Sequence, residues 1–291
     1  MRVSAAIVTY NRLPLLKECI HAVLNQSMEV ESVIVIDNAS TDGTREFLSG
    51  LNHPKVHTTF HDKNMGGAAG FAEGIAIATR QGSDAVWIMD DDTVPHQDTL
   101  QRLAEAIDGK SDVGFVCSKV VWTDGAVHMM NIPGFVSSAD ENESIRQIRS
   151  ASFVSLLVPC RIIREVGLPY KEFFIWVDDA EFTSRIFKAG HKGLLVNDSV
   201  AEHKTATNYG ATISTATQES AWKFYYHMRN GMFASRDEDI WIVWFFKYLN
   251  RLWQDIRRSR HLPKETRSVL RKNLWKGFVD GLTFRPDKSF V

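Results

Sequence analysis

The sequence has 291 residues, of which 44% are hydrophobic and 24% are charged, a composition typical of a globular protein. This length suits one large α/β domain or two modest domains. The 34 basic and 35 acidic residues give a formal net charge of −1, which argues against a general nucleic-acid binder. The three cysteines form no CxxC pair, so we expect neither a disulfide framework nor a zinc knuckle.

Targeting signals and membrane spans are missing from the sequence pattern. The chain opens with MRVSAAIVTYNR, which shows no signal-peptide pattern and leads directly into a strand. No apolar run reaches the ~18–20 residues that a membrane span needs. We therefore expect a cytoplasmic protein, with attachment to a surface left open.

The first two thirds of the chain alternate strand patterns with helix patterns. Short apolar runs that end at polar residues predict strands at Val3–Thr9, Ser32–Asp37, Val56–His61, Ala85–Asp90 and Val113–Val121. The stretches between them predict helices at Leu13–Leu24, Thr44–Leu48, Ala68–Arg80 and Gln97–Ile107. This alternation predicts an α/β fold with a mostly parallel central sheet flanked by helices. In such sheets, ligands bind at the carboxyl ends of the strands.

The pattern weakens in the middle of the chain. The polar segment Asp124–Arg149 predicts a long loop or flap over the site. A strand at Ala151–Val158, a helix at Asp178–Ala189 and a strand at Gly193–Asn197 follow, and helical patterns dominate after roughly Thr215. We expect one domain over residues 1–214 and a helical C-terminal region over residues 215–291.

Three adjacent carboxylates, Asp90, Asp91 and Asp92, follow a buried strand pattern. Like charges at this spacing repel one another, and a divalent cation would relieve the conflict. Because alternate positions of an extended segment project to the same side, Asp90 and Asp92 can share a metal ion while Asp91 faces another way. A solvated acidic turn that caps the next helix is the alternative interpretation.

Two further strand ends carry small and polar residues. DNASTDGT, residues 37–44, fits a turn with a helix N-cap, and Asp37 is also well placed to bond a ribose or a base. NMGGAAG, residues 64–70, opens a helix whose N-terminal amides favour anions. The GxGxxG register of dinucleotide-binding proteins is absent after the first strand, which disfavours an oxidoreductase.

The order and spacing of four motifs resemble the sugar-nucleotide half of family 2 inverting glycosyltransferases, which have a GT-A fold. The motifs are TYNR (residues 9–12), DNASTDGT, NMGGAAG and MDDD. The resemblance covers roughly residues 3–205 and implies a donor half over about 1–122 and an acceptor half over about 150–214. It implies Mn²⁺ or Mg²⁺ on Asp90 and Asp92. It also implies that a nucleoside-diphosphate sugar is bound by Thr9, Arg12, Asp37, Asn64, Gly66, Gly67 and Asp91.

The segment FIWVDDAEF, residues 174–182, resembles the acceptor-side acidic motif of the same family. The resemblance implies that Asp179 is the general base that deprotonates the acceptor hydroxyl, with Trp176 and Asp178 on the acceptor side. Partial burial would raise the pKa of such a base. Two alternatives stay open: Asp178 also suits a helix cap, and Trp176 suits a core position as well as a sugar platform.

A late histidine, His203, follows the strand predicted at Gly193–Asn197. A single histidine is more often structural, but the resemblance implies a third metal ligand, a role that neutral imidazole can fill. Asn208, Tyr209 and Gly210 suggest a loop that orders when the donor binds.

Several motifs resemble bacterial galactofuranosyl- and rhamnosyltransferases: FIWxDDxEF, NxGGxxGF at residues 64–71 and YYxxRN at residues 225–230. These enzymes build surface glycans from UDP-galactofuranose or dTDP-rhamnose. The resemblance implies galactofuranose transfer to a glycan or polyprenyl-diphosphate-linked acceptor, with rhamnose transfer as the alternative. Outside the enzymes, a non-catalytic nucleotide-sugar-binding module stays open. Helix packing explains Tyr225, Tyr226 and Arg229 equally well.

Near the C-terminus, apolar side chains recur at helical spacing along one predicted face: Trp241, Trp244, Phe245, Tyr248, Leu249, Leu252, Trp253 and Ile256. Between Lys247 and Lys276, ten Lys/Arg stand against two Asp/Glu, a local charge of +8 that leaves −9 for the rest of the chain. Three interpretations stay open: packing on the protein, a homodimer interface, and an interfacial helix on the anionic inner face of the cell membrane.

Overall fold

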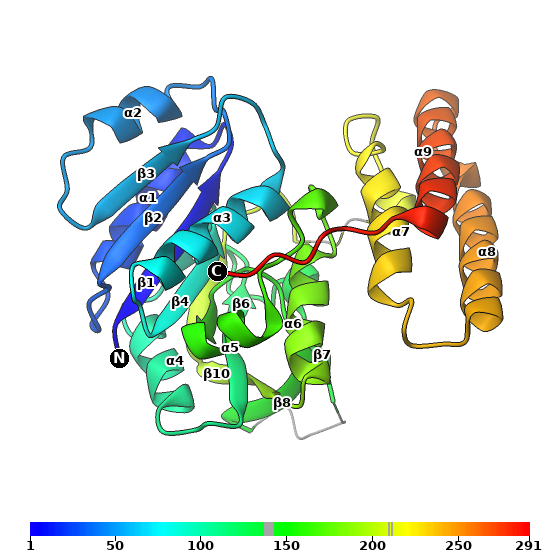
Figure 1. Ribbon diagram of the computed structural model, residues 1–291. Coiled ribbons are helices and arrows are strands. Elements are labelled where there is room, and N and C mark those ends of the chain that lie inside the picture. Colours follow the sequence, from blue (N-terminus) through cyan, green and yellow to red (C-terminus); the bar gives the residue numbers. More distant parts are fainter. Residues whose placement is uncertain (137–142, 209, 211) are drawn as a thin grey trace. The chain divides into compact units, whose positions relative to one another are not determined.

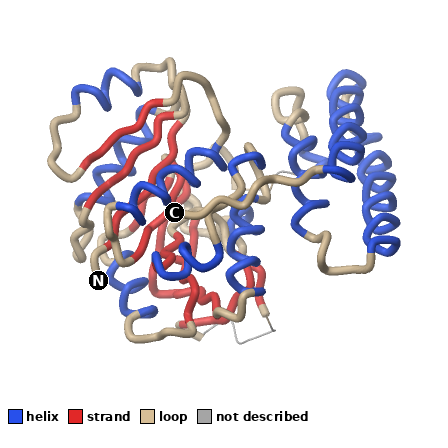
Figure 2. Tube along the Cα trace, viewed as in Figure 1, coloured by secondary structure: helices blue, strands red, loops and turns tan. Residues whose placement is uncertain are grey.

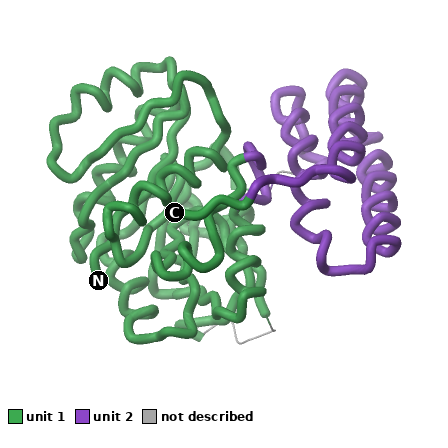
Figure 3. The backbone as a smooth tube through the Cα atoms, in the orientation of Figure 1, with its two compact units in different colours: residues 1–171, 179–209, 288–291 green, residues 172–178, 210–287 purple. Residues whose placement is uncertain are grey.

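The computed structural model describes residues 1–136, 143–208, 210 and 212–291. The chain forms two compact units, coloured separately in Figure 3. The first unit comprises Met1–Lys171, Asp179–Tyr209 and Lys288–Val291, and the second comprises Glu172–Asp178 and Gly210–Asp287. The second unit therefore takes in Glu172–Asp178, a segment that the sequence alone assigned to the acceptor half. Tyr209, from the loop suggested to order on donor binding, lies outside the described residues.

Within the described part of the first unit, ten strands form one mixed sheet (Figure 1). Its neighbours run in the order β3-β2-β1-β4-β9-β6-β10-β8-β7, and β5 pairs with β10. The strands are β1 Val3–Thr9, β2 Ser32–Asp37, β3 Val56–Phe60, β4 Ala85–Asp90, β5 Thr93–Pro95, β6 Val113–Val121, β7 Gly134–Phe135, β8 Ile145–Ser150, β9 Leu156–Pro159 and β10 Lys192–His203. β1 to β4 run parallel, as do β6 and β10, whereas β9 is antiparallel to both β4 and β6.

Helices cover both faces of this sheet (Figure 2). The helices of the first unit are α1 Leu13–Leu24, α2 Thr44–Gly50, α3 Gly67–Arg80, α4 Thr99–Ile107, α5 Cys160–Val166 and α6 Asp178–Lys188, whose first residue belongs to the second unit. On β1, Ala6 and Val8 pack with α3 in one core, while Ala5 and Ile7 pack with α1 and α4 in the other. Both faces of the strand are buried, which explains its continuous apolar run. The predicted α/β class with flanking helices is confirmed.

The middle of the chain differs from the sequence-based expectation. The predicted loop over Asp124–Arg149 is wrong for its last part, because β8 (Ile145–Ser150) pairs antiparallel with β10. Within β8, Ile148 alone is fully buried, so the segment lacks a strand's apolar alternation. Helix α5 was also missed, and the strand predicted at Ala151–Val158 is shorter, at Leu156–Pro159. Residues 137–142 of the predicted flap lie outside the described part of the chain.

Helices dominate the second unit, as its amphipathic sequence predicts. They are α7 Lys223–Ala234, α8 Trp241–Arg258 and α9 Lys264–Thr283. Their shared core contains Phe224, Met228, Trp244, Leu252 and Leu274. Among the described residues, no helix combines the length and the apolar character needed to cross a membrane.

Candidate active site

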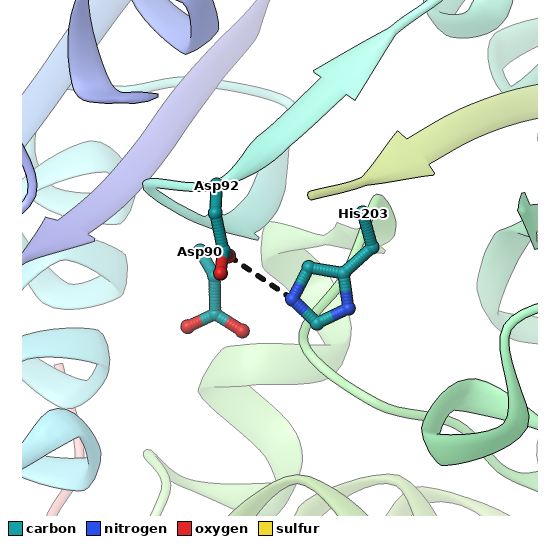
Figure 4. Close-up of side chains that lie close together, drawn as sticks. All are labelled: Asp90, Asp92 and His203. Carbon is teal, nitrogen blue, oxygen red and sulfur yellow. Dashed lines mark ion pairs between the residues drawn. The ribbon is translucent and has the colours of Figure 1, made fainter. Parts of the chain in front are cut away.

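Two aspartates and one histidine meet at the carboxyl end of β4. Asp90 ends β4, Asp92 lies two residues later, and His203 ends β10. One ligand atom from each lies within 4.8 Å of the other two (Figure 4). The short strand β5 brings them together, because Thr93 pairs with His203 across an antiparallel ladder.

The donor set of this cluster fits a divalent cation. Asp92 Oδ1 is buried and lies 3.0 Å from His203 Nε2, and no other described residue donates a hydrogen bond to it. A cation between the two side chains would satisfy both the buried oxygen and the ring nitrogen. Two carboxylates and one imidazole form a ligand set that Mn²⁺ accepts and that Mg²⁺ accepts less readily.

Asp91 faces away from this cluster, toward the end of β1. Thr9 Oγ1 donates to Asp91 Oδ2 over 2.7 Å, and the amide of Tyr10 donates to the same oxygen over 3.3 Å. Arg12 Nη1 lies 3.3 Å from Asp91 Oδ1 and contacts Asp92 Oδ2. Asp91 therefore holds Thr9 and Arg12 at the strand end, while one guanidinium offsets the charge of two carboxylates.

The two neighbouring carboxylates have different protonation behaviour. Burial raises the pKa of Asp91 to about 6, and the Arg12 charge opposes that rise. Burial also acts on Asp92, but the nearby His203 and Arg12 together hold the pKa of Asp92 below its usual value. Asp92 is therefore anionic at neutral pH and available as an oxygen ligand.

Asn131 sets the orientation of His203. The Nδ1–H of His203 donates to Asn131 Oδ1 over 2.8 Å, and Asn131 Nδ2 donates to Ser152 Oγ over 2.8 Å. Because Nδ1 carries a proton in this bond, a neutral His203 keeps its lone pair on Nε2, the nitrogen that faces Asp92. Histidine ligands of metals are oriented in this way by a partner on the other ring nitrogen.

A second histidine, His128, supports Asn131. Its ring lies 4.6 Å from the His203 ring between centroids. His128 Nδ1 accepts from the amide of Met130, and its Nε2–H donates to Thr205 Oγ1 over 2.7 Å. Burial lowers the pKa of His128 to about 4, so the ring is neutral and caps the short turn that carries Asn131.

Asp37 lies at the end of β2, paired with Thr9 on β1. The side chain is fully buried, and its Oδ1 accepts from the amide of Ser40 over 3.1 Å. Its Oδ2 has no hydrogen-bond partner within the part of the chain that the structure describes. This oxygen suits an N–H or O–H donor of a bound nucleoside.

The glycine-rich turn before α3 is tied to the end of β2 through Asn38. Asn38 Nδ2 donates to Asn64 Oδ1 over 3.0 Å, and the same Asn64 oxygen accepts from the amide of Gly66 over 2.8 Å. Gly66 has a φ of 84°, a left-handed value that favours glycine. Asn64 therefore shapes this turn, and Gly67 begins the helix behind it.

Asp179 lies in the first turn of α6 and is half-buried. The amide of Ala180 donates to its Oδ1 over 2.6 Å. Burial raises the pKa of Asp179, against backbone hydrogen bonds that include one from Phe153. A raised pKa brings a carboxylate closer to the range of an effective general base.

Two hydrogen bonds of Thr183 and the nearby backbone of Phe153 place Asp179 at a defined end of the sheet, because Thr183 Oγ1 accepts from the amide of Ala151 over 3.1 Å and donates to the Asp179 carbonyl over 2.7 Å. Phe153 lies three residues before Leu156, which pairs with Ile88 of the antiparallel neighbour β4. The chain before β9 and the chain after β4 therefore lie at the same sheet edge. Asp179 and the cluster around Asp90 share this edge.

Trp176 and Asp178, the predicted acceptor-side residues, belong to the second unit. The ring of Trp176 packs edge-on against Phe224 at 5.3 Å and His227 at 5.8 Å, which favours a structural position for this tryptophan. Asp178 is buried and is the first residue of α6.

The segment before Asp178 is strained. Phe174, Trp176 and Val177 have φ values of 65°, 64° and 73°, which non-glycine residues rarely adopt. The buried Asn230 of α7 stabilises it, with Nδ2 within 3.2 Å of the carbonyl oxygens of Phe173, Ile175 and Trp176. The YYxxRN motif contains Asn230 but does not indicate this role, and no sequence motif marks Asn131.

The sequence profile of the family described as Glycosyl transferase family 2 matches residues 4–165. This range is more than half of the chain and contains all four strand-end motifs. The chain belongs to glycosyl transferase family 2. It is therefore a glycosyltransferase, and the resemblance seen in its motifs is confirmed.

Curated relatives of this glycosyltransferase come from different organisms. Galactofuranosyltransferase GlfT1 of Mycolicibacterium smegmatis is 27% identical over 205 residues, which cover 65% of this chain and 66% of the relative. Glycosyltransferase AglE of Haloferax volcanii is 28% identical over 208 residues, covering 69% of this chain and 66% of the relative. The chain thus spans about two thirds of the length of these relatives.

Solved structures share the fold of this glycosyltransferase. S. aureus TarS 1-349 aligns with a TM-score of 0.61 and 17% identity over 97% of this chain and 81% of that chain. GalNAc-T7, solved with UDP, GalNAc and Mn²⁺, aligns with a TM-score of 0.61 and 14% identity over 97% of this chain and 56% of that chain. These likenesses support a GT-A fold.

The geometry around His203 yields a prediction on metal affinity. Asn131→Leu removes the acceptor for Nδ1 and should weaken Mn²⁺ binding about 10–100-fold, because the imidazole loses its orientation. Asn131→Asp keeps an acceptor and should stay near wild type. Titration of Mn²⁺, followed by electron paramagnetic resonance, measures the difference.

Ser152→Ala is the matched control, because it removes the other hydrogen bond of the same amide and leaves Oδ1 in place. Equal losses in Asn131→Leu and Ser152→Ala would show that packing of the turn matters and that the Nδ1 bond does not.

Proposed function

We propose that this chain is an inverting, metal-dependent glycosyltransferase. It transfers galactofuranose from UDP-galactofuranose to a glycan or polyprenyl-diphosphate-linked acceptor during synthesis of a bacterial surface polysaccharide. The observation that carries the proposal is the cluster of Asp90, Asp92 and His203 at the same sheet edge as the unpartnered oxygen of Asp37 and the half-buried Asp179. That end of the sheet therefore carries groups suited to binding the nucleoside, holding the metal ion and deprotonating the acceptor.

The donor side is built at the ends of β1, β2 and β4. Asp37 Oδ2 would accept a hydrogen bond from the base or ribose, and Thr9 and Arg12 would lie beside the diphosphate. A divalent cation held by Asp90, Asp92 and His203 would offset the charge that develops on the departing diphosphate. Arg12 adds a fixed positive charge there, since its guanidinium already contacts Asp92.

The acceptor side depends on Asp179. As general base it would take the proton from the acceptor hydroxyl while that oxygen attacks the anomeric carbon. The C–O bond to the diphosphate breaks on the opposite face of the sugar, so the configuration inverts. Its half-buried position and raised pKa suit this role, and hydrogen bonds from backbone amides hold the carboxylate in place.

The choice of galactofuranose is supported by the relatives. GlfT1 proteins of Mycolicibacterium smegmatis and Mycobacterium tuberculosis, both named galactofuranosyltransferases, match about two thirds of this chain at 27% identity. Abequosyltransferase RfbV of Salmonella typhimurium matches a smaller share, 41%, at 29% identity. Transfer of rhamnose from dTDP-rhamnose is the runner-up.

A panel of nucleotide sugars tests the donor. In the presence of Mn²⁺, UDP-galactofuranose should raise the melting temperature of the chain more than dTDP-rhamnose or UDP-galactopyranose does, because only the matching donor makes every hydrogen bond of the site. Differential scanning fluorimetry measures the shifts. A larger shift with dTDP-rhamnose would replace the galactofuranose assignment, and no shift with any donor would contradict the donor site.

The metal ligands are tested by Asp92→Asn, which preserves shape and removes the charge. Loss of a direct ligand should weaken Mn²⁺-dependent UDP binding by more than the roughly 100-fold upper range expected for a supporting residue. Isothermal titration with and without Mn²⁺ measures it, and Asp98→Asn, on an exposed aspartate paired with Arg102, is the control. UDP affinity that stays the same in Asp92→Asn would remove Asp92 from the metal site.

The base is tested by Asp179→Asn. This variant should bind UDP with wild-type affinity while turnover falls about 10²–10⁴-fold. In the wild type, kcat/KM should fall as the pH drops below the pKa of Asp179, because the base must be deprotonated. Burial raises that pKa, so the fall should begin above the usual range of an aspartate.

Turnover at a series of pH values, with donor affinity measured in parallel, checks both statements. Asp112→Asn, on an exposed aspartate paired with Lys192, serves as the control and should keep wild-type turnover. An Asp179→Asn variant with full turnover would exclude Asp179 as the base.

A further inference from the structure

Helix α8 is apolar on two opposite faces. Trp244, Tyr248 and Leu252 point into the core of the second unit and are buried. Each helical residue advances about 100°, so Phe246 and Trp253 lie roughly 180–200° away from Trp244. Their side chains are 57% and 55% exposed. Packing of the second unit therefore accounts for one apolar face of α8 and leaves the other uncovered.

The uncovered residues form one continuous surface with α9. Phe245 links the two helices, because its ring stacks on Trp241 at 5.6 Å and lies 6.0 Å from Phe278 of α9. Phe278 in turn contacts Trp275, which is 56% exposed. We call this surface the aromatic face and define it by its large exposed side chains: Trp241, Ile242, Phe246, Leu249, Trp253 and Trp275.

The two helices that carry the aromatic face are rich in cationic side chains. The segment Lys247–Lys276, which spans most of α8 and α9, carries ten Lys/Arg and two Asp/Glu, a local charge of +8. The Arg257 guanidinium lies 4.4 Å from the centre of the Trp253 ring. Exposed tryptophans beside arginine and lysine are typical of helices that lie at the boundary between lipid headgroups and acyl chains.

The positive charge of the segment Lys247–Lys276 indicates whether the aromatic face binds a lipid bilayer or a second copy of the chain. In a symmetric dimer across this face, the +8 segment of one copy would meet the +8 segment of the other, and like charges oppose such contact. An anionic bilayer attracts the same segment, with a gain of about 1 kcal/mol for each cation near the surface. The same cations thus favour lipid and disfavour a second copy.

We propose that the aromatic face binds the surface of a bilayer that contains anionic phospholipids, with α8 and α9 lying in the plane of the interface. This inference deepens the proposed function and rests on it in one respect: a polyprenyl-diphosphate-linked acceptor is presented at such a surface. Lipid binding itself needs neither donor nor acceptor, so it is measured separately from the transfer reaction.

Cosedimentation of the full chain with vesicles tests the proposal. The wild type should bind phosphatidylcholine vesicles that contain phosphatidylglycerol, bind pure phosphatidylcholine vesicles much less, and be released by added salt. Phe246→Ser combined with Trp253→Ser should lower the partition coefficient at least about tenfold, because two large side chains no longer enter the interface. Both residues face outward, so circular dichroism and thermal unfolding should match the wild type.

Val136→Ser combined with Ile145→Ser is the matched control, because it removes two exposed apolar side chains from the first unit. This control should bind vesicles like the wild type. Equal binding by the Phe246/Trp253 variant, or no vesicle binding by the wild type, would overturn the proposal. So would a wild-type dimer in sedimentation velocity that the Phe246/Trp253 variant dissociates, since the face would then be a protein interface.

Turnover on a soluble acceptor separates this inference from the proposed function. If the wild-type chain transfers the sugar but does not bind vesicles, only the lipid proposal is contradicted. If the chain binds anionic vesicles but no nucleotide sugar, only the proposed function is contradicted.

Discussion

Repulsion among the three carboxylates at the end of β4 is the constraint on which the site depends. Asp91 relieves part of it by turning toward Thr9, and the guanidinium of Arg12 offsets charge on both Asp91 and Asp92. His203 completes the arrangement from β10. The same charges that would bind a cation thus hold the end of β1, so this strand end and the cluster of Asp90, Asp92 and His203 form one electrostatic cluster.

The sheet topology decides which residues can join this electrostatic cluster. Antiparallel β9 lies between β4 and β6 and brings Phe153, and through it Asp179, to the edge where β4 ends. Pairing of β5 with the end of β10 brings His203 to Asp92. The turn that carries Asn131 then holds the far side of the imidazole. If β9 ran parallel to β4, the segment that precedes β9, which includes Phe153, would lie at the opposite end of the sheet.

The second unit shows a different balance of forces. Strain in the segment before Asp178 is offset by the buried Asn230, one side chain that lies within hydrogen-bond distance of three carbonyl groups. The helices that carry Asn230 and its neighbours have a full core of their own, yet α8 keeps a second apolar face. A helix that only packed on its neighbours would place polar side chains there. The exposed aromatic side chains on this second face of α8 are the physical reason for proposing that it binds a lipid surface.

Local pattern in the sequence was enough to determine the strands β1, β2, β4 and β6, the helix α1 and the acidic motif, because burial on both sheet faces and helical periodicity act over a few residues. It also marked Asp90, Asp92 and His203 through their resemblance to a family. The strand β8, the hydrogen bond from His203 to Asn131 and the position of Asp179 through Phe153 depended on the tertiary structure. Each joins residues that are distant along the chain, and side chains such as Asn131 acquire a role only through a partner that folding brings to them.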